Sequence, residues 1–166
     1  MTSMPSIANP TTLVIISILW ASIKALCQAK ARGFADVVFL DSVTGKYIEE
    51  ASGCNIFTLK GNVLSTPKIN GNILPGINRK SIIEIAKSFG YQVEERRILV
   101  DELSDADEVF CTGTAVVVTS VACITYQNNR FEYKTGKETV TRKLREALTG
   151  IQNGSIEDKM GWTIEI

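Results

Sequence analysis

The spacing of apolar residues along the chain predicts three amphipathic helices. From Ile82 to Phe89, apolar residues recur at intervals of three and four positions, so that they share one face of a helix. Residues 140–151 repeat this spacing near the end of the sequence. A third helix is expected over 22–32, where Gly33 follows as a typical C-terminal stop.

Shorter segments rich in β-branched and aromatic residues predict strands between the helices. They lie at 37–40, 47–51, 55–59, 63–65, 91–99, 109–111, 116–124 and 131–133. Gly61-Asn62 is typical of a hairpin turn, residues 127–130 indicate another turn, and residues 100–106 predict a short acidic helix. The pattern therefore predicts a mixed α/β fold.

The first residues differ from the rest of the chain. No charged residue precedes Lys24, and Leu13 to Trp20 is apolar apart from Ser17. This run is too short to cross a bilayer, it lacks the basic start of a signal peptide, and it is not the Arg-rich segment of a transit peptide. We expect a buried strand or the first turns of a core helix. We divide the chain into a distinct, uncharged segment at 1–22 and one domain at 23–166.

Composition excludes several classes of function. The chain has 166 residues, 45% of them hydrophobic, which suits one globular domain. Its 18 basic and 18 acidic residues cancel, so we expect no nucleic-acid partner, and no membrane association is expected either. Without any histidine, the chain contains no Ser-His-Asp or Cys-His arrangement and no histidine-bearing metal site.

The four cysteines are spaced too widely for a C-x-x-C pair. They are Cys27, Cys54, Cys111 and Cys123. We expect small, mostly buried residues in a reducing compartment rather than disulfides or a zinc site.

A glycine-rich loop precedes the second helix and is the first candidate for chemistry. The stretch Gly71 to Lys80 contains two glycines and a proline, and Asn78 is a favourable N-cap residue. The start of a helix gathers free backbone N–H groups and the positive end of the helix dipole, which suits a phosphate group. A capped surface helix is the alternative interpretation.

Two further stretches have related properties. Thr112-Gly113-Thr114-Ala115 follows a predicted strand and can hold an oxyanion or a phosphate, because Gly113 permits close backbone approach and the threonine hydroxyls add donors. A plain turn at a strand end is the alternative interpretation. Glu49 and Glu50 end another strand and face opposite sides of it, so one carboxylate can point inward towards a cationic partner such as a protonated pyridine. Two phosphate cradles and a carboxylate together fit a pyridoxal phosphate site.

With these residues the chain resembles the large, C-terminal domain of branched-chain amino acid aminotransferases, most closely the plant type. These are class IV, fold-type IV pyridoxal-phosphate enzymes. The matching motifs occur in the right order at 24–34, 38–42, 47–57, 73–79, 106–115, 150–154, 157–158 and 161–162. The resemblance implies the large-domain fold of this family, a twisted, barrel-like sheet with outer helices.

The resemblance also implies an activity and its residues. Members transfer an amino group between leucine, isoleucine or valine and 2-oxoglutarate. The cofactor-binding residues by position are Glu50 for the pyridine nitrogen and Ile77, Asn78, Gly113 and Thr114 for the phosphate. The amides of Thr114 and Ala115 would meet the substrate carboxylate. The family usually has threonine where this chain has Asn78, so a hydroxyl is absent there while the backbone donors remain.

One departure concerns catalysis itself. The Schiff-base lysine of the family falls near Val14 in this sequence, and Ile18-Leu19 stands where the family has Asn-Tyr. Residues 1–23 contain no lysine, and Lys24 matches a different family lysine, on a helix surface. We therefore assign no catalytic residue and expect this chain alone to be inactive or nearly so, because the lysine supplies both the covalent link and the base.

Two classes of function stay open. In the first, the chain is an aminotransferase by ancestry with a truncated or misassigned N-terminus, and the intact product is the enzyme. In the second, it is a non-catalytic half-protein that binds the cofactor, forms homo-oligomers or pairs with a full-length subunit. A related class IV activity, D-amino acid aminotransferase or aminodeoxychorismate lyase, is a further alternative. The expected compartment is the plastid or the cytoplasm.

Overall fold

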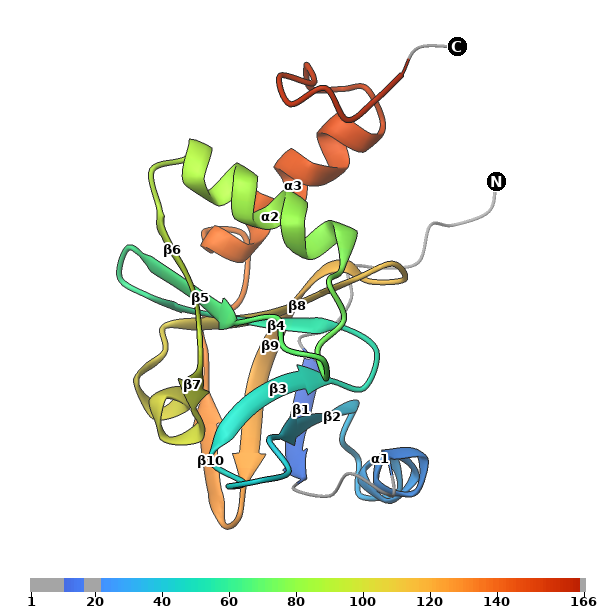
Figure 1. Cartoon of the computed structure of the whole chain (residues 1–166), viewed down its shortest axis with the longest axis vertical. Helices are drawn as coiled ribbons and strands as arrows, with labels where there is room; N and C mark the ends of the chain where they lie inside the picture. The colour runs from blue at the N-terminus through green and yellow to red at the C-terminus, as the bar shows by residue number, and fades with distance from the viewer. Residues whose placement is uncertain (1–10, 17–21, 165–166) are drawn as a thin grey trace.

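A computed structural model describes residues 11–16 and 22–164 of the protein. Its helices are α1 (Ser22–Ala31), α2 (Ile77–Ser88) and α3 (Val140–Gln152), with a 3-10 helix η1 (Val100–Asp105). Its strands are β1 (Thr11–Ile16), β2 (Asp36–Leu40), β3 (Tyr47–Ala51), β4 (Asn55–Lys60), β5 (Val63–Pro67), β6 (Gln92–Arg96), β7 (Ile98–Leu99), β8 (Glu108–Gly113), β9 (Val117–Tyr126) and β10 (Asn129–Glu132). The predicted mixed α/β fold is confirmed (Figure 1).

All described strands belong to one mixed sheet. Its order is β6-β5-β4-β8-β9-β1-β2-β3-β7, and β10 pairs with β9 beside this path. Strand β8 pairs antiparallel with β4 and with β9, whereas β1 pairs parallel with β2 and β9 (Figure 1). The predicted distinct segment at 1–22 lies mostly outside the described residues, Ile18-Leu19 included. Its described part, β1, is the buried strand that is one of the two expectations for this region.

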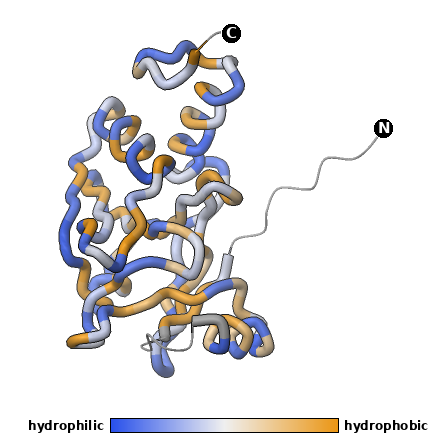
Figure 2. The backbone as a smooth tube through the Cα atoms, turned by 45° about the vertical axis from the view of Figure 1, so that its right-hand side comes forward, coloured by the Kyte–Doolittle hydropathy of each residue, from blue (hydrophilic) through white to orange (hydrophobic). Residues whose placement is uncertain are grey.

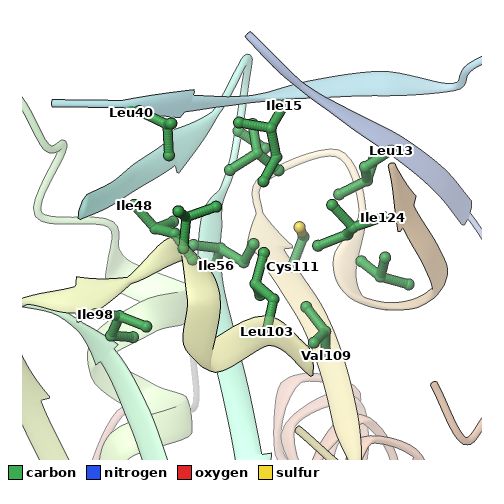
Figure 3. Packing of buried hydrophobic residues seen from close by; sticks show 14 of the residues in the cluster. Leu13, Ile15, Leu40, Ile48, Ile56, Ile98, Leu103, Val109, Cys111 and Ile124 are labelled. Atoms are coloured by element: carbon green, nitrogen blue, oxygen red, sulfur yellow. The ribbon is translucent and has the colours of Figure 1, made fainter. Parts of the chain in front are cut away.

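The sheet curves around one apolar core. Side chains from strands far apart in the order meet there, as Figure 3 shows for Leu13 of β1, Ile48 of β3, Ile56 of β4 and Ile124 of β9. Leu103 of η1 is also fully buried in this cluster. A strand places alternate side chains on opposite faces, so one face of each strand lines this core while the other is free to meet the helices. The curved sheet agrees with the predicted barrel-like arrangement.

Helices cover the outer face. Helices α2 and α3 pack on the apolar side chains of β4, β5 and β8, where Phe57 and Phe110 stack with ring centroids 4.9 Å apart. Helix α1 packs separately, with Ala29 against Val14 and Val37. Figure 2 shows hydrophobic and hydrophilic positions alternating along these helices, as expected for helices buried on one side.

Several local expectations are wrong. Helix α2 starts at Ile77 with Gly76 as its N-cap, so Asn78 is not the capping residue but belongs to the first turn. The predicted strand at 91–99 is divided into β6 and β7, and residues 129–130, expected in a turn, already pair with β9. Phe89, expected on the buried face of α2, is half exposed because it is the C-cap, beyond the last helical residue.

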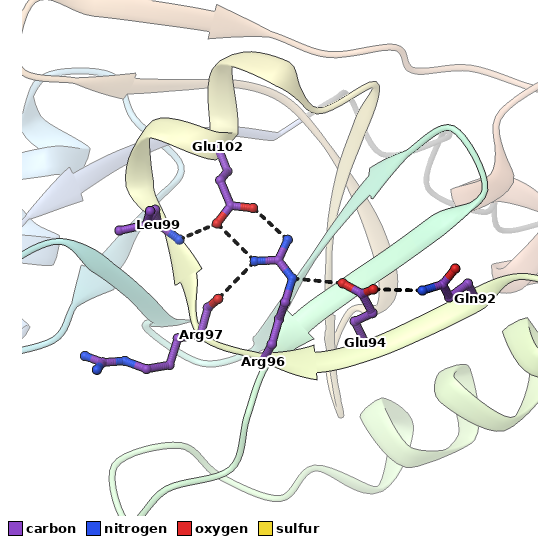
Figure 4. A network of polar contacts seen from close by, with 6 residues as sticks. All are labelled: Gln92, Glu94, Arg96, Arg97, Leu99 and Glu102. Atoms are coloured by element: carbon purple, nitrogen blue, oxygen red, sulfur yellow. Dashed lines mark hydrogen bonds and ion pairs between the residues drawn. The ribbon is translucent and has the colours of Figure 1, made fainter.

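Charged residues connect β6 to η1 at one edge of the sheet. Arg96 binds Glu102 (Nη2 to Oε2, 2.6 Å) and Glu94 (Nε to Oε2, 3.0 Å), and Glu102 also accepts from the Leu99 N–H (Figure 4). The Arg96 and Glu102 side chains are each more than a third exposed, so water screens their attraction. This network fixes the geometry of the connection more than it stabilises the fold.

The cysteines are all free thiols. Cys111 and Cys123 are buried, Cys54 is half-buried and Cys27 is exposed. Within residues 11–16 and 22–164, no helix is long and apolar enough to cross a membrane, and no group of three potential metal ligands gathers.

A buried carboxylate closes the start of α3. Glu108, at the beginning of β8, is 5% exposed and accepts from Val140 N (2.9 Å), Thr141 N (2.9 Å) and Thr141 Oγ1 (2.7 Å). Two of these donors are N–H groups that the helix itself cannot satisfy, and a carboxylate there also meets the positive end of the helix dipole. Glu108 thereby attaches α3 to the central strand.

The variant Glu108→Ala should lose about 3 kcal/mol of unfolding free energy, because three buried donors lose their acceptor. Urea denaturation measures this change. The matched control is Glu84→Ala on α2, whose carboxylate makes a 4.0 Å contact with the exposed Lys80, and we expect a change below about 0.5 kcal/mol there. Equal effects for the two variants would contradict the capping role.

A second carboxylate organises the β2–β3 connection. Asp41 accepts from the backbone N–H groups of Thr44, Lys46 and Tyr47. Burial acts to raise the pKa of Asp41, but these hydrogen bonds outweigh it and hold the pKa at about 2, below the ordinary 3.8. Since the folded-state pKa is lowered, the ionised carboxylate stabilises the fold above pH 3.8, and this stabilisation is lost as the pH falls towards 2.

The variant Asp41→Asn should therefore flatten the acid limb of the stability profile. Above pH 4 it should be less stable than the wild type by about 1–3 kcal/mol, because an amide oxygen replaces two accepting oxygens. Below pH 3 the difference should shrink, as the wild-type carboxyl becomes protonated. Urea denaturation between pH 2 and 6 tests this, with Asp105→Asn at the exposed end of η1 as the control. A constant difference across this range would contradict the assignment.

Candidate functional site

A cavity of about 690 Å³ lies where three distant stretches of the chain meet. The turn between β3 and β4 forms one wall, the loop leading into α2 forms another, and the end of β8 forms the third. The lining residues are Glu50, Ser52, Gly53, Cys54, Asn55, Leu74, Pro75, Gly76, Ile77, Asn78, Arg79, Thr112, Gly113, Thr114, Val117 and Gln152. The three candidate stretches of the sequence therefore form one site.

The start of α2 faces this cavity with unused donors. Gly76 has an extended backbone and makes no side-chain cap, and the first backbone bond back to it comes from Lys80 N (3.1 Å). The N–H groups of Ile77, Asn78 and Arg79 have no partner within the described part of the chain. Free N–H groups at the positive end of a helix dipole form a binding site for an anion.

Side-chain amides hold the loop before α2 in place. Asn55 Nδ2 donates to Leu74 O (2.8 Å), and Asn78 Nδ2 donates to Gly113 O (2.9 Å). The second bond joins the first turn of α2 to the end of β8. The free N–H groups at the start of α2 are therefore fixed relative to the end of β8 before any ligand binds.

Two glycines allow this close approach. A Cβ atom on Gly113 would lie 3.0 Å from Gly53 O and 3.1 Å from the Cys54 Cβ. A Cβ atom on Gly76 would overlap Asn55 Oδ1, on the side chain that holds Leu74. Both positions need glycine because neighbouring atoms occupy the space, and neither requires a positive φ angle.

A carboxylate at the end of β3 also lines the cavity. Glu50 Oε2 accepts from Leu74 N (3.2 Å). Burial raises the pKa of Glu50, the Leu74 N–H opposes this, and the nearby Glu49 carboxylate raises the pKa further. Burial and the Glu49 charge thus disfavour the ionised form of Glu50. A cationic group placed beside Glu50 would stabilise that ionised form. Glu49 itself is buried and accepts from Asn72 Nδ2 (3.1 Å), so it is occupied within the loop.

The structure brings together most of the predicted site residues. Glu50, Ile77, Asn78, Gly113 and Thr114 all line the cavity. Ala115 is exposed beside it and is not part of the lining. Val14, at the predicted lysine position, packs against α1 in a separate cluster, and Lys24 is exposed on α1. No lysine is among the cavity-lining residues of the part of the chain that the structure describes.

Asn55 and Gln152 line the cavity but are not predicted from the sequence, whereas Thr112 belongs to the predicted turn after β8. Asn55 and Thr112 lie opposite each other in the β4–β8 pairing, and both are buried polar residues within apolar strands. The alternation of side chains along β4 and β8 places both residues on the face that the helices cover. A polar residue on that otherwise apolar face is the signal in the sequence that could have indicated them. Gln152 reaches the cavity from the end of α3, and no local pattern indicates this.

These residues suit a ligand that carries both a phosphate and a basic ring nitrogen. The free N–H groups at the start of α2 can bind a phosphate, and Glu50 can accept from a cationic nitrogen. Thr112 Oγ1, a buried atom of a lining residue, has no partner in the described residues. Buried polar groups are normally hydrogen-bonded, so this hydroxyl is available to a polar ligand.

Sequence relatives agree with this geometry. The chain is 62% identical over 144 residues to a chloroplastic branched-chain-amino-acid aminotransferase of Arabidopsis thaliana, and the match covers 87% of this chain and 37% of the relative. A mitochondrial branched-chain amino acid aminotransferase of Humulus lupulus is 60% identical (86% and 36% covered). A methionine aminotransferase of Arabidopsis thaliana is 54% identical (85% and 40% covered). The chain thus spans less than half the length of these relatives.

Solved structures share the fold. The branched-chain amino acid aminotransferase of Escherichia coli superimposes with a TM-score of 0.80 at 29% identity, covering 92% of this chain and 56% of that one. A T.th. branched-chain amino acid aminotransferase, solved with pyridoxamine 5'-phosphate, gives a TM-score of 0.78 at 31% identity, with 92% and 55% covered. The predicted large-domain fold is confirmed by these likenesses.

A family model fits the chain directly. The model of class IV amino-transferases matches residues 8–124, which include β1, the loop before α2 and the end of β8. The match covers most of the chain and every lining residue of the cavity except Gln152. This chain belongs to the class IV amino-transferase family.

Proposed function

We propose that this chain is the cofactor-binding large domain of a branched-chain aminotransferase, and that its cavity binds pyridoxal 5'-phosphate or its amine form. One observation carries the proposal: the start of α2, the end of β8 and Glu50 line a single cavity although they are far apart in the sequence. The identity of 62% to a branched-chain-amino-acid aminotransferase supports the choice of chemistry.

The proposed contacts use the residues that line the cavity. The backbone N–H groups of Ile77 and Asn78 bind the phosphate from one side, and those of Gly113 and Thr114 bind it from the other. Glu50 binds the ring nitrogen and keeps it protonated, because the two opposite charges stabilise each other in a half-buried site. The cofactor, when bound, supplies the electron-withdrawing ring that amino-group transfer needs. We keep Ala115 as a proposed contact to the substrate carboxylate, through its amide at the cavity edge.

The full reaction needs groups beyond the described cavity. Transfer between leucine, isoleucine or valine and 2-oxoglutarate requires an amine to hold the cofactor aldehyde and move the proton. No described lining residue supplies one, and Val14 packs away from the cavity. We therefore propose that the chain alone binds the cofactor with little or no turnover. The methionine aminotransferase among its relatives makes a thioether side chain a second substrate class to assay.

A non-catalytic pairing role is the alternative, and one surface feature favours it. Leu74 (70% exposed) and Ile77 (83% exposed) stand at the mouth of the cavity, and Val116 (37% exposed) follows the end of β8. Exposed apolar side chains around a polar cavity are typical of a surface that another chain or domain covers. A second copy of this chain or a longer family member is the proposed partner, and sedimentation of the chain with and without such a member tests this.

The proposal also includes the bounds of the domain and the cellular compartment. The proposed large domain comprises residues 23–166 together with β1, because β1 pairs with β2 and β9 in the same sheet. The compartment is the plastid, with the cytoplasm as the alternative, because similar proteins are chloroplastic or mitochondrial. Imaging of the chain fused to a fluorescent protein in plant cells distinguishes these compartments.

Binding of pyridoxamine 5'-phosphate to the purified chain is the primary test. We expect saturable binding by calorimetry, and about 10- to 100-fold weaker binding by Glu50→Gln, since a hydrogen bond to a charged group is lost. The control is Glu132→Gln on β10, whose carboxylate pairs with the exposed Arg130. Reduction with borohydride after addition of pyridoxal phosphate should leave no stable, site-specific lysine adduct by mass spectrometry. No binding, or an effect equal in the two variants, would refute the proposal.

Enlarging Gly113 tests the close approach of the two walls. Gly113→Ala should displace the end of β8 and weaken pyridoxamine 5'-phosphate binding by about tenfold or more, with about 1–2 kcal/mol lost in stability, as expected for overpacking. The matched control is Gly71→Ala, where an added Cβ meets nothing within 4 Å. Calorimetry and urea denaturation measure both. Unchanged binding by the Gly113 variant would show that the end of β8 does not contact the ligand.

A further inference from the structure

Unpartnered buried donors concentrate at the cavity. Within the part of the chain that the structure describes, three buried side-chain polar atoms lack a hydrogen-bond partner: Arg79 Nε, Thr112 Oγ1 and Tyr133 Oη. Two of the three belong to residues that line the same cavity. An unpaired buried polar group costs free energy, so its presence in a folded protein indicates a partner that arrives from outside the chain.

The Thr112 hydroxyl is placed by the pairing of β8. Thr112 lies opposite Asn55 of β4 and is 1% exposed. It shares the helix-covered face of β8 with Glu108 and Phe110, since side chains two apart in a strand point the same way. Glu108 is fully occupied at α3 and Phe110 stacks on Phe57, so Thr112 is the last residue of this face and the one that meets the cavity.

Neighbouring side-chain donors are already in use. Asn55 Nδ2 is bound to Leu74 O, and Asn78 Nδ2 is bound to Gly113 O. The Arg79 guanidinium binds Pro67 O and Glu95 Oε2 through Nη2, and its Nε–H has no partner among the described residues. Since Pro67 and Glu95 lie outside the cavity lining, the Arg79 guanidinium is directed away from it, and Thr112 Oγ1 is the buried side-chain donor that accompanies the unused backbone N–H groups at the start of α2.

We propose that the Thr112 hydroxyl donates a hydrogen bond to the anionic group bound at the start of α2. This rests on the proposed function in one respect, namely that the anion is the phosphate of a pyridoxal-type ligand. The Asn78 amide is then a positioning group that joins the first turn of α2 to the end of β8.

The test removes the hydroxyl and keeps the shape. Thr112→Val is isosteric, Thr112→Ser keeps the hydroxyl, and Thr58→Val makes the same change at a buried position of β4 outside the cavity. Binding of pyridoxamine 5'-phosphate, of pyridoxamine without phosphate and of inorganic phosphate is measured by calorimetry. Melting of each protein without ligand is measured in parallel.

For Thr112→Val we expect weaker phosphate binding but no loss of thermal stability. Thr112→Val should bind pyridoxamine 5'-phosphate and inorganic phosphate about tenfold or more weakly, because a hydrogen bond to a charged group is lost. Its binding of pyridoxamine should stay close to that of the wild type. Without ligand, the same variant should melt at or above the wild-type temperature, because an unpaired buried hydroxyl has been removed. Thr112→Ser and Thr58→Val should bind like the wild type.

Other results overturn specific claims. If Thr112→Val binds the phosphate ligands like the wild type, or loses pyridoxamine equally, Thr112 is not a phosphate donor. If it melts well below the wild type, the hydroxyl has a structural partner and the inference fails. If the wild type binds inorganic phosphate through Thr112 but not pyridoxamine 5'-phosphate, the inference stands and the proposed cofactor is wrong.

Discussion

The pairing of β8 with strands on both of its sides is the constraint on which the rest of the structure depends. Its backbone is bonded to β4 and β9 along its length, so it has little freedom to shift. Its first residue, Glu108, holds the start of α3, and its last residue, Gly113, meets the start of α2 through Asn78. One strand thus fixes both helices that cover this part of the sheet and one wall of the cavity.

The cavity is shaped before a ligand arrives. Amide side chains from β4 and α2 hold the loop, and the N–H groups that would bind an anion are not consumed by the fold. Binding then requires little rearrangement, which favours affinity for a small ligand. The backbone N–H groups of the first turn of α2 do not depend on the side chain at position 78, so the asparagine there leaves them free while its amide binds Gly113 O.

The sequence predicts helices and strands well where the hydrophobic periodicity is strong. It predicts the location of the site where glycines mark a loop or a turn. The loop before α2 and the turn after β8 are recognisable because Gly76 and Gly113 break otherwise regular patterns. The start of α2 is misplaced because Asn78 is a good cap by residue type, whereas the structure uses the extended backbone of Gly76 and directs the Asn78 amide across the cavity. The sequence indicates threonine hydroxyl donors in the turn after β8, but it does not show that Thr112 is the buried one, because β-branched residues are ordinary in strands.

The position of β1 has a consequence for how the chain is made. Strand β1 lies between β2 and β9, and its partners in β9 follow it by more than a hundred residues. During synthesis β1 and β2 leave the ribosome early with one long edge unpaired, and the sheet cannot be completed until β9 has emerged. Parallel pairing over such a sequence separation forms slowly, and an open apolar edge recruits other chains. We expect the yield of native protein to depend on protection of this edge during translation.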